Sequence, residues 1–225
     1  MFEAVILAGG KGTRLKSVTG DLPKPMIDVG GQPFLYLLMK RLEQQGCSHI
    51  VLSLCYQADY IVKRVTEDKP VSIPVDFVIE KSALGTGGAL KLAASSVTSE
   101  AFVALNGDTL TDINFADIAG AYPQAGLVIC GVEVDDVSRY GTLQLDSEHN
   151  VLGMREKGLT GKGTINSGIY VINKANMLGV AEDAFSFESD YVQKFKGTFK
   201  VFVHNGYFID IGIPEDYYRA CREIV

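Results

Sequence analysis

The sequence predicts an α/β fold in which a Rossmann-like, mostly parallel sheet is flanked by helices. Short apolar runs bounded by glycine or polar residues have the length and composition of buried parallel strands. They occur at residues 2–7, 49–54, 75–79 and 101–105. Turns and helix-like patterns alternate with these runs, and that alternation favours parallel pairing through right-handed crossovers.

The first half of the chain is expected to hold three helices between these strands. Residues 33–45 are predicted to be helical because Pro33 stands near the start and Gly46 follows the end. A second helix is expected over residues 59–67. A third opens at the end of the segment 80–89.

The second half is richer in strands and is expected to add a small β subregion. Strands are predicted at residues 127–132, 166–172 and 200–203. Residues 141–146 and 151–157 can pair as a hairpin.

Two further helices are expected near the end of the chain. One begins within residues 185–188, with Ser186 as a candidate N-cap, because a serine hydroxyl can accept from the free N–H groups of a first turn. Residues 215–224 are predicted to form the closing helix.

Length and composition indicate one globular domain. The 225 residues are 47% hydrophobic and 21% charged, without repeats or linkers, so we expect a single domain over 1–225. Its halves would divide into about 1–110 and about 111–225. The net charge of −6 argues against a nucleic-acid binder, although it does not exclude a nucleotide ligand. A homo-oligomer stays open.

Nothing in the sequence points to a membrane or an oxidising compartment. The N-terminal apolar run lacks a basic flank and is too short for a signal peptide or a membrane span. The cysteines show no metal-type spacing and are expected to be reduced and mostly buried: Cys47, Cys55, Cys130 and Cys221. The histidines fit no ligand spacing and are expected to be structural: His49, His149 and His204. We therefore expect a cytoplasmic protein.

A glycine-rich loop follows the first strand. Gly9, Gly10 and Gly12 can turn backbone N–H groups inward as a cradle for an anion. The loop is not a dinucleotide fingerprint, because Leu15 stands where the third glycine is required, and no P-loop ending is present. Ordinary turn glycines are the alternative interpretation.

Two basic residues complete a candidate triphosphate site. Arg14 can fork onto phosphate oxygens, while Lys24, between two prolines, supplies a compact charge. Open α/β sheets bind ligands at the carboxyl ends of their strands, so we expect the triphosphate there.

Carboxylates at the same sheet edge suggest a metal ion. Asp108 follows the strand at 101–105 and the turn Asn106-Gly107, and Mg²⁺ prefers one or two carboxylates with phosphate oxygens and waters. Asp210 is flanked by apolar residues, so its charge must be solvated, paired or bound to metal. Structural turn aspartates are the alternative for both.

The segment 80–89 is predicted to contact a base. Glu80 can only accept hydrogen bonds when ionised, and guanine offers an imino and an amino donor side by side. Gly85, Gly87 and Gly88 would let the backbone approach a flat ring. The alternative is a surface salt bridge between Glu80 and Lys81.

These motifs resemble those of the sugar-1-phosphate nucleotidyltransferases, the NDP-sugar pyrophosphorylases. The resemblance rests on Gly-Gly-Lys-Gly-Thr-Arg-Leu at residues 9–15 and Pro-Lys-Pro at 23–25, and it extends over nearly the whole chain. Within that family, it is most specific for the guanylyltransferases of D-glycero-D-manno-heptose 1-phosphate. The resemblance implies the nucleotidyltransferase fold.

The resemblance assigns expected roles by position. Nucleotide contacts are expected from Leu7, Ala8, Gly9, Gly10, Gly12, Thr13, Arg14, Lys24, Glu80, Gly85, Thr86, Asn106, Gly107 and Asp108. Sugar-phosphate contacts are expected from Tyr140, Gly141, Glu156, Lys157, Asn166 and Gly168, with Glu188 nearby. The metal ligands would be Asp108 and Asp210. The catalytic set would be Arg14, Lys24, Asp108, Lys157 and Asp210.

The implied activity is nucleotidyl transfer with Mg²⁺ as cofactor. The expected substrates are a nucleoside triphosphate, with GTP favoured, and a sugar 1-phosphate, with D-glycero-α-D-manno-heptose 1-phosphate favoured. Mannose or glucose 1-phosphate, a phosphocholine-like acceptor, and UTP, CTP or dTTP stay open. So does a catalytically silent regulatory subunit that binds nucleotide sugars, and Glu156-Lys157 could be an ordinary solvated pair.

Overall fold

The computed structural model describes residues 1–122, 126–146, 151–155, 158–195, 197 and 199–224. The strands of its main sheet are β1 (Phe2–Leu7), β4 (Cys47–Leu54), β5 (Val75–Ile79), β6 (Ala101–Asn106), β8 (Leu127–Val134), β9 (Thr142–Leu145), β10 (Val151–Arg155), β11 (Gly163–Asn173) and β12 (Phe199–His204). Within the described residues their order is β10-β9-β11-β6-β1-β4-β5, and β8 links β11 to β12.

The expected α/β fold with its mostly parallel sheet is confirmed. β1 pairs in parallel with β4 and β6, and β4 pairs in parallel with β5. The second half departs from this pattern, because β11 runs antiparallel to both β6 and β8. The predicted hairpin is present as the antiparallel pair β9–β10. The β-rich half therefore extends the same sheet.

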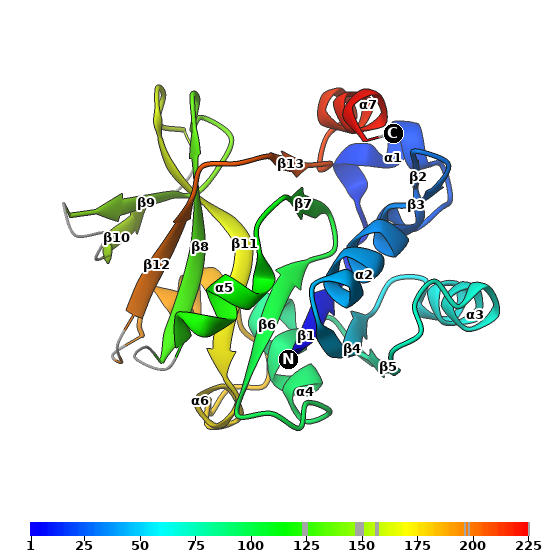
Figure 1. Cartoon of the computed structure of the whole chain (residues 1–225), viewed down its shortest axis with the longest axis horizontal. Coiled ribbons are helices and arrows are strands. Elements are labelled where there is room, and N and C mark those ends of the chain that lie inside the picture. The colour runs from blue at the N-terminus through cyan, green and yellow to red at the C-terminus, as the bar shows by residue number, and fades with distance from the viewer. Residues whose placement is uncertain (123–125, 147–150, 156–157, 196, 198, 225) are drawn as a thin grey trace.

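The central strand β1 is apolar apart from Glu3 because both faces of the sheet are covered. Ala4 and Ile6 of β1 join a core cluster with α2 (Phe34–Gln44) and α3 (Ala58–Asp68). Val5 points the other way, into a cluster with α4 (Gly85–Ala94). This alternation of sides follows from the two-residue repeat of a strand. Figure 1 shows β1 in the middle of the molecule, with these helices around it.

The predicted helices are confirmed with small shifts at their ends. The closing helix is α7 (Pro214–Glu223). The helix expected to begin within 185–188 is a π-helix, Phe187–Val192, and the Ser186 hydroxyl caps it by accepting from the Ser189 N–H at 3.3 Å.

Several short elements were not predicted. They are α1 (Lys16–Thr19), α5 (Phe115–Gly120), α6 (Lys174–Leu178), the 3₁₀ turns Thr13–Leu15 and Lys24–Met26, the ladder β2 (Asp28–Val29) with β3 (Gln32–Pro33), and the ladder β7 (Thr109–Thr111) with β13 (Phe208–Asp210). The β7–β13 ladder matters most, because its antiparallel register sets Asp210 opposite Thr109.

The end of the chain packs against its beginning. The Tyr217 hydroxyl on α7 donates to the Asp28 carbonyl at 3.1 Å. A Cβ at Gly30 would lie only 2.9 Å from the Ile224 carbonyl oxygen. In Figure 1 the red helix α7 accordingly lies beside α1 and β2.

The cysteine prediction was right in part. All four thiols are free; Cys47 and Cys130 are buried, whereas Cys55 and Cys221 are half-buried. Two of the three histidines fit the expected structural role, because a ring nitrogen of His49 and of His204 lies within hydrogen-bond distance of a neighbouring carboxylate. His149 lies outside the described residues. No described helix is long and apolar enough to span a lipid bilayer.

Glu3 anchors the amino end of β1 with a buried carboxylate, 5% exposed. It accepts from the Thr98 N–H at 2.9 Å, the Thr98 hydroxyl at 3.0 Å and the Ser99 N–H, and it pairs with His49 at 2.8 Å. Burial alone would raise the pKa of Glu3, but the hydrogen bonds from Ser99, His49 and Thr98 outweigh burial and lower that pKa to about 2.

We predict that Glu3→Gln destabilises the protein by about 2 kcal/mol at pH 6. The pKa of Glu3 is lower in the folded protein than in the unfolded chain. The ionised carboxylate therefore contributes its full stabilisation of the fold above pH 4.5, and this contribution is lost as the pH falls toward 2. Urea unfolding between pH 6 and pH 3 should therefore show the gap to wild type closing. Glu67→Gln, at a side chain that is 57% exposed, is the control. A gap independent of pH would contradict the assignment.

Candidate active site

A cavity of about 380 Å³ lies at the carboxyl ends of β1, β4 and β6; we call it the loop cavity. It is lined by Leu7, Ala8, Gly9, Gly10, Lys24, Pro25, Ser53, Cys55, Glu80, Ala83, Gly85, Thr86, Ala89, Asn106, Gly107, Asp108 and Glu188. Most residues expected to contact the nucleotide are thus brought together at the sheet edge where ligands of open α/β folds bind.

Backbone bonds between neighbouring strands fix the rim of this cavity. The Gly107 N–H donates to the Leu7 carbonyl at 2.8 Å, and the Ala8 N–H donates to the Ser53 carbonyl at 2.9 Å. A Cβ at Gly107 would lie 2.7 Å from the Leu7 carbonyl oxygen, so the turn after β6 needs glycine for close approach. Nothing lies within 4 Å of a Cβ built at Gly10, which faces open space.

Three expected nucleotide contacts lie outside the described lining of the loop cavity. Gly12, with φ +60°, packs against the Lys24 side chain, whose Cβ lies 2.8 Å from a Cβ built at Gly12. Thr13 and Arg14 belong to the exposed 3₁₀ turn that follows. A guanidinium nitrogen of Arg14 lies 3.5 Å from a Cβ built at Gly212, so Arg14 approaches the Asp210 segment.

Lys24 and Asp108 form a close ion pair in the wall of the loop cavity. The Lys24 residue is only 8% exposed, and a buried ammonium group needs such a partner. The Asp108 side chain is more exposed than that of Lys24, at 30% against 10%.

The two candidate metal ligands meet across the ladder of β7 and β13. The Ile211 N–H donates to the Asp108 carbonyl at 2.9 Å, and the Gly212 N–H donates to the Asp210 carboxylate at 2.7 Å. Burial raises the pKa of Asp210, and the Asp108 charge raises it further, while Lys24, the Gly212 N–H and Arg14 oppose this rise. Two carboxylates and two cations therefore act on one another at a single point.

A second cavity of about 300 Å³, the strand cavity, opens beside the loop cavity. It is lined by Asn106, Thr109, Tyr140, Gly141, Met154, Asn166, Ser167, Gly168, Tyr170, Glu188, Gln193, Phe208 and Asp210. Four expected sugar-phosphate residues are in that lining: Tyr140, Gly141, Asn166 and Gly168. Glu156 and Lys157 lie outside the described residues. Asn106 and Glu188 line both cavities.

Hydrogen bonds order the polar wall of the strand cavity. The Asn166 amide donates to the Tyr170 hydroxyl at 2.9 Å and accepts from the Gly168 N–H at 3.0 Å. Gly168 has φ +76°, and a Cβ there would meet the Asn106 amide nitrogen at 2.2 Å. Only glycine allows β11 and β6 to approach this closely at the junction of the cavities.

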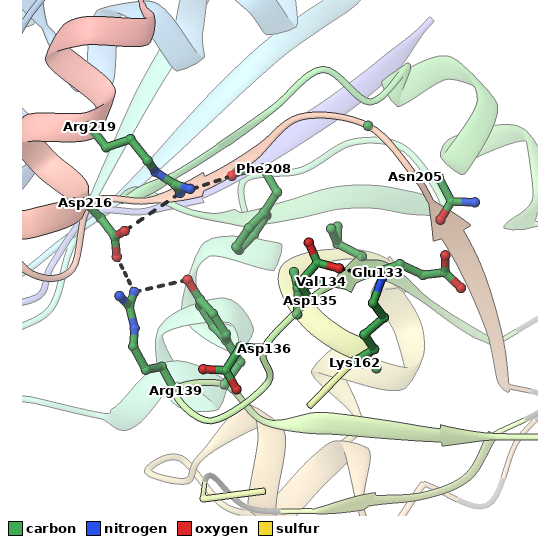
Figure 2. A pocket seen from close by; sticks show the side chains of 14 residues that line it. Glu133, Val134, Asp135, Asp136, Arg139, Lys162, Asn205, Phe208, Asp216 and Arg219 are labelled. Carbon is green, nitrogen blue, oxygen red and sulfur yellow. Dashed lines mark hydrogen bonds and ion pairs between the residues drawn. The ribbon is translucent and has the colours of Figure 1, made fainter. Parts of the chain in front are cut away.

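A charged network that includes Arg139, Asp216 and Arg219 lies next to Phe208, as Figure 2 shows. Arg139 pairs with Asp216 on α7 and donates to the Tyr140 hydroxyl at 3.1 Å. The Tyr140 ring packs edge-on against Phe208, with centroids 5.7 Å apart. Tyr140 and Phe208 separate the strand cavity from the wider, mixed-charge hollow of about 780 Å³ drawn in Figure 2. The network thus ties α7 to the cavity wall.

Of the three glycines that were expected to let the backbone approach a base, two pack against protein instead. The Glu80 carboxylate accepts from the Leu84 N–H at 2.9 Å, which fixes its orientation at the cavity rim. Gly85 lines the loop cavity, but Gly87 and Gly88 are buried outside its described lining. A Cβ at Gly87 would lie 2.1 Å from the Phe185 ring, so these small residues admit the segment before the π-helix.

Sequence reasoning missed several lining residues of the loop cavity. Ser53 is the next-to-last residue of β4 and Cys55 follows that strand, whose carboxyl end lies beside that of β1. The rule that ligands bind at the carboxyl ends of parallel strands, which located Asp108, could therefore have located Ser53 and Cys55. Ala83 and Ala89 carried no chemical signal.

The fold and this pair of cavities define the class of the protein as an α/β transferase that uses a nucleotide. The chain belongs to the nucleotidyl transferase family, whose model matches residues 3–225. It is 37% identical over 219 residues to the D-glycero-alpha-D-manno-heptose 1-phosphate guanylyltransferase of Campylobacter jejuni, covering 96% of this chain and 97% of the relative. The enzyme of that name from Aneurinibacillus thermoaerophilus is 36% identical, covering 99% and 98%.

A solved structure also matches over its whole length. HddC from Yersinia pseudotuberculosis, crystallised with GMP-PN, superposes with a TM-score of 0.94 at 52% identity, covering 100% of both chains. The family resemblance drawn from the motifs is therefore confirmed.

We predict that Gly88→Ala destabilises the protein by about 2 kcal/mol, although alanine favours a helix over glycine by about 1 kcal/mol. The new methyl group would lie 2.3 Å from the Asp183 carbonyl oxygen, and backbone cannot yield cheaply. Gly120→Ala, at the end of α5 with nothing within 4 Å, should be neutral or slightly stabilising. Denaturant unfolding of both variants makes the comparison, and equal stabilities would refute the packing role.

We also predict that Asp210→Asn raises the melting temperature by roughly 2–4 °C at pH 7 in the presence of a chelator. The substitution removes a buried charge that faces Asp108, and asparagine can still accept from the Gly212 N–H. Because the folded pKa is raised, the gain should vanish below the ordinary aspartate value near 4 and grow as the pH rises. Asp21→Asn, at an exposed side chain, is the control. A lower melting temperature for Asp210→Asn would contradict the prediction. It would mean that the attraction of Arg14 and Lys24 for the Asp210 charge exceeds the cost of its burial and of its repulsion by Asp108.

Proposed function

We propose that this protein transfers a guanylyl group from GTP to D-glycero-α-D-manno-heptose 1-phosphate, giving a GDP-heptose and pyrophosphate. The observation that carries the proposal is the convergence of Lys24, Arg14, Asp108 and Asp210 where the two cavities meet. The guanylyltransferases that match nearly the full chain support the choice of both substrates. In this proposal, residues up to about 110 serve the nucleotide and the remainder of the domain serves the acceptor.

The loop cavity would hold the nucleotide. Backbone N–H groups of the glycine loop would face the phosphates, and Lys24 would supply a positive charge beside them. Gly12 would act through Lys24, on which it packs. Thr13 and Arg14 would close over the phosphates from the exposed turn.

Glu80 would select the base. Its carboxylate is oriented by the Leu84 N–H and faces Gly9 across the cavity rim, with one oxygen 3.3 Å from a Cβ built at Gly9. An ionised carboxylate accepts the imino and amino donors of guanine together, whereas uracil and thymine carry carbonyls on both sides of a single donor. Gly85 and Thr86 would line the same base.

The strand cavity would hold the sugar phosphate. Asn166 and Gly168 would contact hydroxyl groups, and Tyr140 with Gly141 would form the facing wall. By resemblance, Lys157 would bind the acceptor phosphate and Glu156 a sugar hydroxyl.

The residues present fit a divalent cation. Asp108 and Asp210 would supply two carboxylates beside the nucleotide phosphates. Burial and then the charge of Asp108 raise the pKa of Asp210, and a bound cation would offset both effects. No group of three or more acidic, histidine or cysteine side chains that could hold a metal occurs among the described residues, so phosphate oxygens and waters would complete the shell. When bound, Mg²⁺ would neutralise charge on the α-phosphate.

The chain's own task is alignment and charge neutralisation. An oxygen of the acceptor phosphate attacks the α-phosphorus in line, the bond to the β-phosphate oxygen breaks, and pyrophosphate leaves. The attacking oxygen is already anionic near neutral pH, so no general base is needed. Lys24, Arg14 and Lys157 would hold two anions together against their repulsion.

A substrate matrix tests this proposal. Four nucleoside triphosphates are combined with mannose, glucose and heptose 1-phosphates in Mg²⁺, and phosphate is measured after pyrophosphatase. We expect GTP with the heptose 1-phosphate to give the highest kcat/KM, at least tenfold above any other pair. EDTA in the transfer step, followed by heat inactivation and excess Mg²⁺ before pyrophosphatase is added, should abolish the signal. Release of no pyrophosphate from any pair would instead favour a silent binding subunit.

A further inference from the structure

Thr86 lines the loop cavity, yet its hydroxyl is used elsewhere. The Thr86 Oγ1 atom donates to the Glu188 carboxylate at 2.9 Å and accepts from the Phe187 N–H at 2.9 Å. A hydroxyl group has one proton, so its donor capacity is spent on Glu188 and is not free for a nucleotide.

Glu188 carries this contact into the strand cavity. It lines both cavities, and its other carboxylate oxygen lies 3.5 Å from the Tyr170 hydroxyl. Tyr170 in turn accepts from the Asn166 amide at 2.9 Å. A chain of polar contacts thus runs from the first turn of α4 to the wall of the strand cavity.

The conformation of the segment supports a functional role. Glu188 is the second residue of the π-helix Phe187–Val192, and π-helical turns are rare and concentrate at functional sites. In this turn Glu188 faces Thr86.

The two segments are joined closely enough to act as one body. The Phe185 N–H donates to the Leu84 carbonyl at 2.9 Å, and the Gly87 N–H donates back to the Phe185 carbonyl at 3.0 Å. Lys91 pairs with Asp183 at 2.7 Å. The start of α4 and the segment that leads into Glu188 therefore hold each other in place.

We propose that Thr86 is a positioning residue for the acceptor: it orients Glu188 and so sets the affinity for the sugar phosphate, although it belongs to the nucleotide segment. This inference rests on the proposed function.

The test separates the KM values of the two substrates. Thr86→Val keeps the side-chain shape and removes the hydroxyl, while Thr86→Ser keeps the hydroxyl. Loss of a hydrogen bond to a charged group predicts that Thr86→Val raises the sugar-phosphate KM about tenfold and changes the GTP KM less than twofold. Thr86→Ser should stay within twofold of wild type for both. Thr66→Val, at an exposed threonine of α3, is the matched control.

A second variant keeps the test valid if Thr86→Val folds poorly. Glu188→Ala should raise the sugar-phosphate KM at least as much, and adding Thr86→Val to it should raise that KM no further. A higher GTP KM with an unchanged sugar-phosphate KM in Thr86→Val would overturn the inference and make the Thr86 hydroxyl a nucleotide contact. An inactive wild-type protein would instead refute the proposed function.

Discussion

The structure depends on holding Asp108 and Asp210 beside each other against their mutual repulsion. The ladder of β7 and β13 fixes both backbones, and hydrogen bonds from Ile211 and Gly212 remove the freedom to turn away. Lys24 offsets part of the negative charge from a buried position. The fold thereby holds two carboxylates and two cationic side chains together between the two cavities, with Asp108 in the lining of one and Asp210 in the lining of the other.

The two cavities are joined by backbone contacts that only small residues allow. Gly168 brings β11 against Asn106 at the end of β6, and Gly88 brings α4 against the segment before the π-helix. Because β6 and β11 are neighbours in one sheet, the two halves of the chain meet along hydrogen-bonded strands and not through a linker. Two reactants bound on either side would consequently have little freedom to separate, which is how a rigid scaffold aids a reaction between anions.

Local patterns were enough to predict the parallel strands, their helices and the residues of the glycine loop. Local patterns could not place Asp210 beside Asp108, because β13 has three residues and pairs with a strand far away in the sequence; that expectation came from the family resemblance alone. The π-helical form of residues 187–192 could not be predicted either, because the segment is held by contacts with α4, which is distant in the sequence. Gly87 shows the same limit of local patterns. A glycine indicates that another group approaches the backbone closely, but the sequence does not say whether that group is a ligand or the Phe185 ring.

The packing of α7 on the first 30 residues has a consequence for biosynthesis. Asp210 and α7 are made after the strands of the main sheet, yet α7 packs against the first 30 residues of the chain. During translation, β1 can pair with β4 and β6 long before this closure occurs. A nascent chain made only as far as residue 205 would therefore contain the strands of the main sheet but not Asp210 or α7, and the candidate site would still be incomplete.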